Sequence, residues 1–233
     1  MSVSYTCHEL PKNAEDLSTS LDRYVSFRLD ALVNAAGQVA ATYTYESTFT
    51  RQMWMSRLLD PKKHHLVVVA HETAAHGLES LDNGEWVGMM SLLGPLSKFE
   101  YFGSDSESSE IKSDDEEVRF DMSSVYINPS HRGGEATLQM FEQVLNVIRS
   151  LADDLLSPPP GTIGSARIRG TIAPSNTNGF GFQEALGFRS IDWWSKAQAY
   201  RAIDFAEVIA PEEEAPELYH VKDQRVIEHV LEC

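Results

Sequence analysis

The pattern of hydrophobic and polar positions predicts helices followed by strands in the first half of the chain. Apolar residues recur at helical spacing over 13–37 and over 51–59. Two short apolar runs, 65–70 and 85–93, are rich in the residues that favour strands, and we expect them to form a hairpin. Residues 39–47 fit either a strand or an ordered loop.

The second half of the chain alternates between segments with the apolar pattern of strands and segments with that of helices. Pro129 ends one apolar run, and a long helix with one apolar face follows it. The order is strand, long helix, strand, short helix and one or two closing strands, over 118–127, 138–155, 166–172, 176–186 and 188–203. The pattern therefore predicts a mixed α/β chain.

Composition and charge restrict the class of protein. The chain has 233 residues, of which 42% are hydrophobic, which suits one globular domain. Its net charge of −16 argues against bulk binding to nucleic acid or to an anionic membrane, because both need a surplus of Lys and Arg. We expect a domain over 1–210, a disordered acidic insertion over 103–117 and an acidic C-terminal tail over 211–233.

The cysteines and the apolar runs bear on the compartment. The two cysteines, Cys7 and Cys233, do not suggest a disulfide scaffold. The first residues lack the pattern of a secretory signal, and the longest apolar run, 66–70, is too short to cross a bilayer. We therefore expect a cytoplasmic protein. The histidines near residue 70 match no metal-ligand spacing, so no metal is expected, and monomer and homodimer stay open.

The clearest chemical motif is a Gly-rich turn between a strand and a helix. His131 and Arg132 precede Gly133 and Gly134, and the amphipathic helix starts directly afterwards. Unpaired N–H groups and the positive end of the helix dipole make such a helix start an anion site. Glycine lets the backbone approach a phosphate. The alternative is a plain tight turn with a solvated Arg132.

This turn and a downstream motif together resemble the GCN5-related N-acetyltransferase (GNAT) superfamily. The family's cofactor motif, roughly (Gln/Arg)-x-x-Gly-x-(Gly/Ala), corresponds to residues 131–136. Its second motif corresponds to Asn176 and to Gly187-Phe188, and the resemblance covers about residues 14–205. It implies a single GNAT-like domain of the α/β (α+β) class. The sheet would be mixed, twisted, mostly antiparallel, flanked by helices and splayed where CoA enters.

The resemblance also implies an activity. The protein would move an acetyl group from acetyl-CoA, as co-substrate, to a primary amine of a small molecule by direct attack in a ternary complex. It places the pantetheine arm along one strand end, the pyrophosphate on the Gly-rich turn, and the acceptor side near the second motif. The residues that correspond to the pantetheine site are Val125, Tyr126 and Ile127. Those that correspond to the pyrophosphate site are Arg132, Gly133, Gly134, Glu135, Ala136 and Thr137, and Asn176 corresponds to the acceptor side.

Proton transfer is the part that the sequence leaves open. Asp121 and Glu46 are candidate general bases. The alternative for Asp121 is a solvated position on a strand face, and the alternative for Glu46 is a loop carboxylate without a catalytic role. Gln183 occupies the position at which the family often has a Tyr that protonates the CoA thiolate. Here Ser175 or water would have to supply that proton. Gln183, and Glu135 beside the pyrophosphate, favour a first alternative, a GNAT-fold protein that binds CoA or another ligand without transferring acetyl groups. A protein or peptide N-acetyltransferase is the second.

Overall fold

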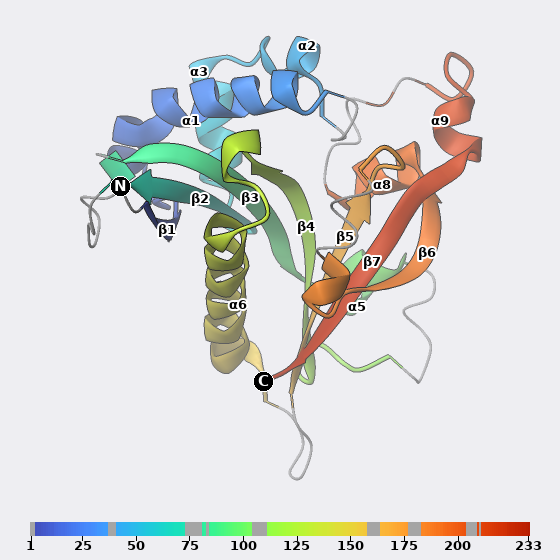
Figure 1. Cartoon of the computed structure of the whole chain (residues 1–233). Helices are drawn as coiled ribbons and strands as arrows, with labels where there is room; N and C mark the ends of the chain where they lie inside the picture. The colour runs from blue at the N-terminus through green and yellow to red at the C-terminus, as the bar shows by residue number, and fades with distance from the viewer. Residues whose placement is uncertain are drawn as a thin grey trace. The chain divides into compact units, whose positions relative to one another are not determined.

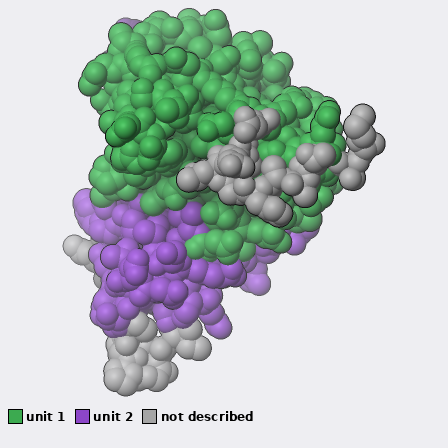
Figure 2. Space-filling view, turned by 90° about the vertical axis from the view of Figure 1, so that its left-hand side faces the viewer, with its two compact units in different colours: residues 1–36, 42–92, 124–146 green, residues 37–41, 93–123, 147–233 purple. Residues whose placement is uncertain are grey.

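The computed structural model divides the chain into two compact units. Unit 1 comprises residues 1–36, 42–92 and 124–146, and unit 2 comprises residues 37–41, 93–123 and 147–233 (Figure 2). The structure describes residues 3–36, 41–72, 81–82, 84–103, 111–157, 164–176, 183–203, 209 and 211–233.

Seven strands of the described residues form one sheet in the order β1-β2-β3-β4-β5-β7-β6 (Figure 1). They are β1 Ser4–Glu9, β2 Lys63–His71, β3 Glu85–Leu96, β4 Glu117–Ile127, β5 Ser165–Ile172, β6 Arg189–Ser195 and β7 Lys222–Glu232. The pairs β1/β2, β5/β7 and β6/β7 are antiparallel, whereas β4 and β5 run parallel. The mixed, mostly antiparallel sheet that we predicted is confirmed.

Helices flank this sheet, and several begin at the caps that the sequence offers. The Asn13 side chain accepts a hydrogen bond from the Asp16 N–H, and the Thr50 side chain accepts one from the Met53 N–H, so the first and third helices start there. The helices are α1 Ala14–Asn34, α2 Tyr43–Glu46, α3 Arg51–Leu58, α5 Lys98–Phe102, α6 Glu135–Leu155, α8 Lys196–Ala202 and α9 Glu217–His220.

The core of unit 1 lies between α1, α3 and the strands β2 and β3. Leu17 and Leu21 of α1 are fully buried, as are the apolar residues 66–69 of β2. The rings of Tyr24 and Trp54 meet edge to face, which joins α1 to α3. Each buried aliphatic side chain stabilises the fold by about 1.5–3 kcal/mol relative to exposure, so this layer fixes β2 and β3 firmly.

Two segments have a different secondary structure from the one expected. Residues 43–46, read as a strand or loop, form the single helical turn α2, because Thr42 caps it by accepting from the Tyr45 N–H. Residues 196–202, read as strand, form α8. Ser195 and Gln198 make a reciprocal capping box there, and this local signal overrides the β-branched and aromatic pattern before it.

The acidic segments are more ordered than predicted. The predicted tail is wrong for residues 222–232, which form β7 and pair with both β5 and β6. Part of the predicted insertion, 104–110, lies outside the described residues. Residues 111–117 contradict the prediction of disorder, because the Asp114 carboxylate accepts a hydrogen bond from the buried Arg119 and β4 begins at Glu117.

None of the described helices combines the length and the apolar character that crossing a membrane requires.

Candidate functional site

Strand β4 bends in its last third. Its parallel register with β5 runs from Glu117 to Met122, and Ser124 follows with φ at 57°. A positive φ is rare for a residue with a Cβ and costs about 1–2 kcal/mol, so it marks a local departure from regular strand geometry. Residues 125–127, the predicted pantetheine segment, continue β4 beyond this bend.

We expect the bend to depend on a residue that tolerates positive φ. Ser124→Val should lower the free energy of unfolding by about 1–2 kcal/mol, because a β-branched side chain fits that conformation poorly. Ser124→Gly should stay within about 1 kcal/mol of the wild type. Urea unfolding of the three proteins measures both. Equal stability of the Val variant would show that β4 does not need this backbone conformation.

The turn after β4 is fixed by backbone and side-chain hydrogen bonds. The Asn128 N–H donates to the Val87 carbonyl (2.7 Å), which attaches the turn to β3. The His131 N–H donates to the Asn128 carbonyl (2.8 Å) and closes a 3-10 turn, Pro129–His131. Gly133 has φ at 74°, and a Cβ built on it or on Gly134 would meet nothing within 4 Å. The glycines therefore face open space.

The backbone donors of this turn are available to a ligand. Among the described residues, the N–H groups of residues 133–136 reach no acceptor, whereas the Thr137 N–H donates to the Gly134 carbonyl (3.2 Å). Four successive N–H groups around the start of the 21-residue helix α6 could hold an anion, because the helix dipole adds positive potential there. Ala136 and Thr137 are buried and anchor this helix start.

Arg132 is held across the turn by its own strand. Its Nε–H donates to the Ile127 carbonyl (2.9 Å), and its guanidinium carbon lies 5.9 Å from the centre of the Tyr126 ring. No described residue accepts from its Nη groups, which leaves a two-pronged donor for a phosphate. Tyr126 and Ile127 are buried and Val125 is half-buried. The predicted cofactor residues 125–127 and 132–137 thus share one strand, turn and helix of unit 1.

Glu46, a predicted general base, lies in a buried ion-pair cluster of unit 1. Its two carboxylate oxygens each accept from Arg28 (2.8 Å), and Arg57 approaches at 3.3 Å. Burial raises the pKa of Glu46, but the hydrogen bonds and charge of Arg28, aided by Arg57, outweigh it, so that pKa is lowered. The cluster joins α2 to α1 and α3. To act as a base Glu46 would have to leave both arginines, and its catalytic role stays a prediction.

Asp121, the other predicted base, is held in a similar way in unit 2. Its two oxygens accept from Arg169 Nε (2.6 Å) and Nη2 (2.8 Å). Burial raises the pKa of Asp121, and Arg169 acts in the opposite direction. The Arg169 guanidinium lies between the rings of Tyr101 (3.8 Å) and Trp194 (4.7 Å). This packing fixes Asp121 as an ion-pair partner, so its catalytic role also stays a prediction.

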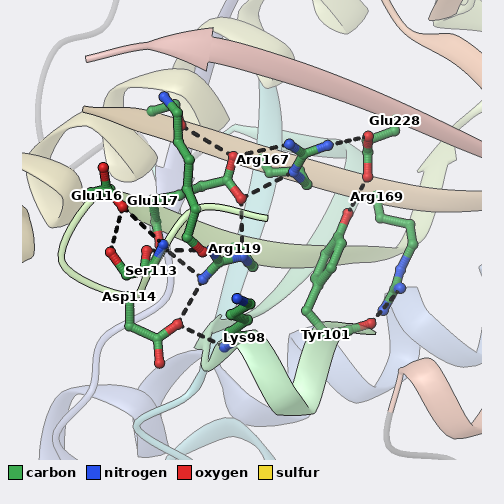
Figure 3. Close-up of polar contacts among 12 residues, drawn as sticks. Lys98, Tyr101, Ser113, Asp114, Glu116, Glu117, Arg119, Arg167, Arg169 and Glu228 are labelled. Carbon is green, nitrogen blue, oxygen red and sulfur yellow. Dashed lines mark hydrogen bonds and ion pairs between the residues drawn. The ribbon is translucent and has the colours of Figure 1, made fainter. Parts of the chain in front are cut away.

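Arg169, the partner of Asp121, also donates from Nη1 to the Tyr101 carbonyl (2.8 Å), which connects it to a larger network of polar contacts, drawn in Figure 3. Glu117 on β4 accepts from Arg167 on β5, and Arg167 also donates to Glu228 on β7. The Tyr101 hydroxyl donates to Glu228 at 3.0 Å. Sequence reasoning missed this network, although acidic and basic residues alternate at 117, 119 and 121. That alternation places them on one face of a strand.

The second predicted motif lies in unit 2 and is described in part. Ser175 is exposed, Asn176 is half-exposed, and the Asn176 N–H donates to the Ala173 carbonyl (2.9 Å). Residues 177–182 lie outside the described residues. Gln183 is 8% exposed, and its Oε1 accepts no hydrogen bond from the residues that the structure describes. The roles of Ser175 and Asn176 stay predictions.

No group of three or more His, Cys, Asp or Glu side chains among the described residues is arranged to hold a metal ion. His64 instead hydrogen-bonds to Glu9 (2.8 Å), and His65 to Ser91 (2.8 Å).

The sheet order, the parallel β4/β5 pair and the turn before α6 define the class of fold. Many solved structures that match the chain over nearly its whole length are acetyltransferases, so the chain has the GNAT acetyltransferase fold, and the resemblance predicted from the two motifs is confirmed at the level of the fold. No protein-family model matches the sequence, and no curated protein matches it.

Solved structures with this fold align over nearly the whole chain. A GNAT-family acetyltransferase of Streptococcus pneumoniae has a TM-score of 0.55 at 10% identity, over 98% of this chain and 100% of that one. Arabidopsis thaliana NAA60, bound to a bisubstrate analogue, has a TM-score of 0.52 at 9% identity, over 100% and 99%. Vibrio cholerae spermidine N-acetyltransferase, in complex with CoA and spermine, gives 0.50 at 12%, over 98% and 95%.

Proposed function

We propose that the protein is an acetyl-CoA-dependent N-acetyltransferase that acetylates a primary amine of a small molecule in the cytoplasm. The observation that carries the proposal is the turn before α6. There, residues 132–136 combine the anchored Arg132, two glycines facing open space and four N–H groups that reach no acceptor among the described residues, which supports an anion site. The CoA pyrophosphate supplies two adjacent anionic groups for these donors.

The chemistry requires little of the protein beyond positioning. The neutral amine attacks the thioester carbonyl, so a C–N bond forms, the C–S bond breaks and the CoA thiolate leaves. The attacking nitrogen loses one proton and the thiolate gains one, so the products are the amide and the CoA thiol. The backbone of residues 125–127, after the bend at Ser124, would pair with the pantetheine arm and hold the thioester in place. No covalent intermediate on the protein is needed.

The environments of the two carboxylates shape the expected pH dependence. Asp121 and Glu46 are both engaged by arginines, so we do not assign either of them as a free base. The acceptor would then lose its proton before it binds. We expect the rate of transfer to rise with pH toward the pKa of the acceptor amine, and to be low at neutral pH for strongly basic amines.

The test is release of CoA thiol from acetyl-CoA, measured with a disulfide reagent. A panel of small amines, peptides with free N-termini and lysine peptides is offered over a range of pH. Thiol release with small amines that rises with pH supports the proposal. Release with peptides alone would move the assignment to a protein or peptide N-acetyltransferase.

A CoA-binding protein without transfer is the second candidate. It is favoured by the ion-paired states of Asp121 and Glu46 and by Gln183, whose amide cannot donate a proton as an acid does. Calorimetric binding of CoA, with no thiol release by any amine at any pH, would support this candidate over the transferase.

A further inference from the structure

A tyrosine from the N-terminal strand contacts the turn before α6. Tyr5 lies on β1, whose six residues all pair with β2. Its hydroxyl oxygen lies 3.0 Å from His131 Nδ1, and the two rings meet edge to face, with centroids 5.8 Å apart and planes at 84°. The contact joins residues 126 positions apart in the sequence, and both belong to unit 1.

The chemistry of the two groups allows this hydrogen bond in either direction, according to the tautomer of His131. A phenol always carries a proton to donate below its pKa of about 10, whereas a neutral imidazole has one donor and one acceptor nitrogen. No other described residue accepts from the Tyr5 hydroxyl. If that hydroxyl donates to Nδ1 of His131, the ring proton lies on Nε2, and Nε2 then carries an N–H that no described residue accepts.

His131 is the last residue of the 3-10 turn and directly precedes Arg132. Tyr5 thus holds the ring directly before residues 133–136, whose N–H groups reach no acceptor within the described part of the chain. The neutral Nε2–H of His131 there would add one more donor for an anion. The tautomer of His131 that provides this donor depends on Tyr5, a residue of the strand β1. A phenylalanine in place of Tyr5 could neither donate nor accept this hydrogen bond.

We propose that Tyr5 is a positioning residue for the anion site, which it completes by holding His131 with Nε2–H available to a phosphate oxygen of CoA. The proposal rests on the proposed function, since it assumes that CoA is the anion bound. It makes β1 part of the cofactor site although β1 contains none of the turn's residues. The proposal gives the two residues different roles. His131 would contact the cofactor, whereas Tyr5 acts only through His131.

The first experiment needs no ligand. Two-bond ¹H–¹⁵N correlation NMR reads the tautomer of His131 in the wild type, in Tyr5→Phe and in the control Tyr219→Phe, which loses a hydroxyl in unit 2. His131→Ala assigns the signal. We expect the Nε2–H tautomer to predominate at a pH where His131 is neutral, and to be mixed in Tyr5→Phe alone. A mixed or Nδ1–H tautomer in the wild type would overturn the proposal.

The second experiment is a double-mutant cycle on the affinity for CoA, measured by calorimetry. Tyr5→Phe should weaken binding by about three- to tenfold and His131→Ala by about tenfold or more, as expected for one neutral and one charge-assisted hydrogen bond. In the His131→Ala background Tyr5→Phe should change affinity by less than about twofold, because the two act as one unit. Tyr219→Phe should bind like the wild type.

The outcomes separate this inference from the proposed function. If the folded wild type does not bind CoA, the proposed function fails, while the NMR result still decides the hydrogen bond. If the wild type binds CoA and Tyr5→Phe binds equally well, the proposed function stands and the positioning role of Tyr5 is wrong. Independent losses from the two substitutions, which add in the double variant, would also overturn it.

Discussion

Gly134→Glu is expected to weaken CoA binding by about two orders of magnitude while leaving the protein folded. A Cβ at this position meets no atom within 4 Å, and the backbone there does not have the positive φ of Gly133, so the side chain can be accommodated. A carboxylate about 5 Å from a phosphate repels it by about 3 kcal/mol at an effective dielectric constant of about 20. That energy corresponds to a loss of roughly a hundredfold or more.

The matched control is Gly134→Gln, which adds the same volume without the charge. Calorimetric titration with CoA should show a loss for the Gln variant that is at least tenfold smaller than the loss for the Glu variant. Circular dichroism and urea unfolding should show all three proteins equally folded. Equal affinities of the Glu and Gln variants would mean that the turn before α6 does not hold the phosphates.

Arg169→Met is expected to lower the free energy of unfolding by about 3–5 kcal/mol at neutral pH, because it leaves the buried Asp121 carboxylate without its partner. Met keeps an apolar side chain next to Tyr101 and Trp194. The lost free energy of unfolding therefore comes more from the missing charge of Arg169 than from altered packing. Urea unfolding at several pH values measures it. The double variant Asp121→Asn with Arg169→Met should recover part of the loss.

The sign of the pH dependence follows from burial. In Arg169→Met, burial raises the pKa of Asp121 above that of the unfolded chain, about 3.9, with no arginine to oppose it. The stability of the variant is then fully present below about pH 4 and is lost as pH rises through the raised pKa. The gap to the wild type should narrow toward acid pH. A gap that stays constant with pH would show that the loss comes from packing.

The strand end, the turn and the helix start around residues 127–137 are the part that the sequence predicted best, because they are local. Pro129, the two glycines and the apolar periodicity after them specify a strand end, a turn and a helix within about twenty residues. Such features depend on backbone preferences and on helix geometry, which neighbouring residues determine. The Nε–H bond from Arg132 to the Ile127 carbonyl spans five residues and is part of the same local unit.

The proton-transfer candidates could not be evaluated from the sequence, because their environments come from distant segments. Asp121 is neutralised by Arg169, which lies 48 residues away, and Glu46 by Arg28, which lies 18 residues away. In the sequence these side chains look like solvated charges. Tyr5 was missed for the same reason, since its partner lies at the other end of unit 1 in the sequence. Only the assembled strands bring such pairs together.

The position of β7 has a consequence for folding. This strand comes last in the sequence, yet it lies between β5 and β6 and pairs with both. During synthesis β5 and β6 are therefore made before β7, and each has an edge whose partner strand is not yet synthesised. The pairing of β5 with β7 joins residues more than 50 positions apart, so loop closure slows its formation. Until residues 222–232 emerge, the exposed edges of β5 and β6 are open to aggregation, and a chaperone would protect the chain at that stage.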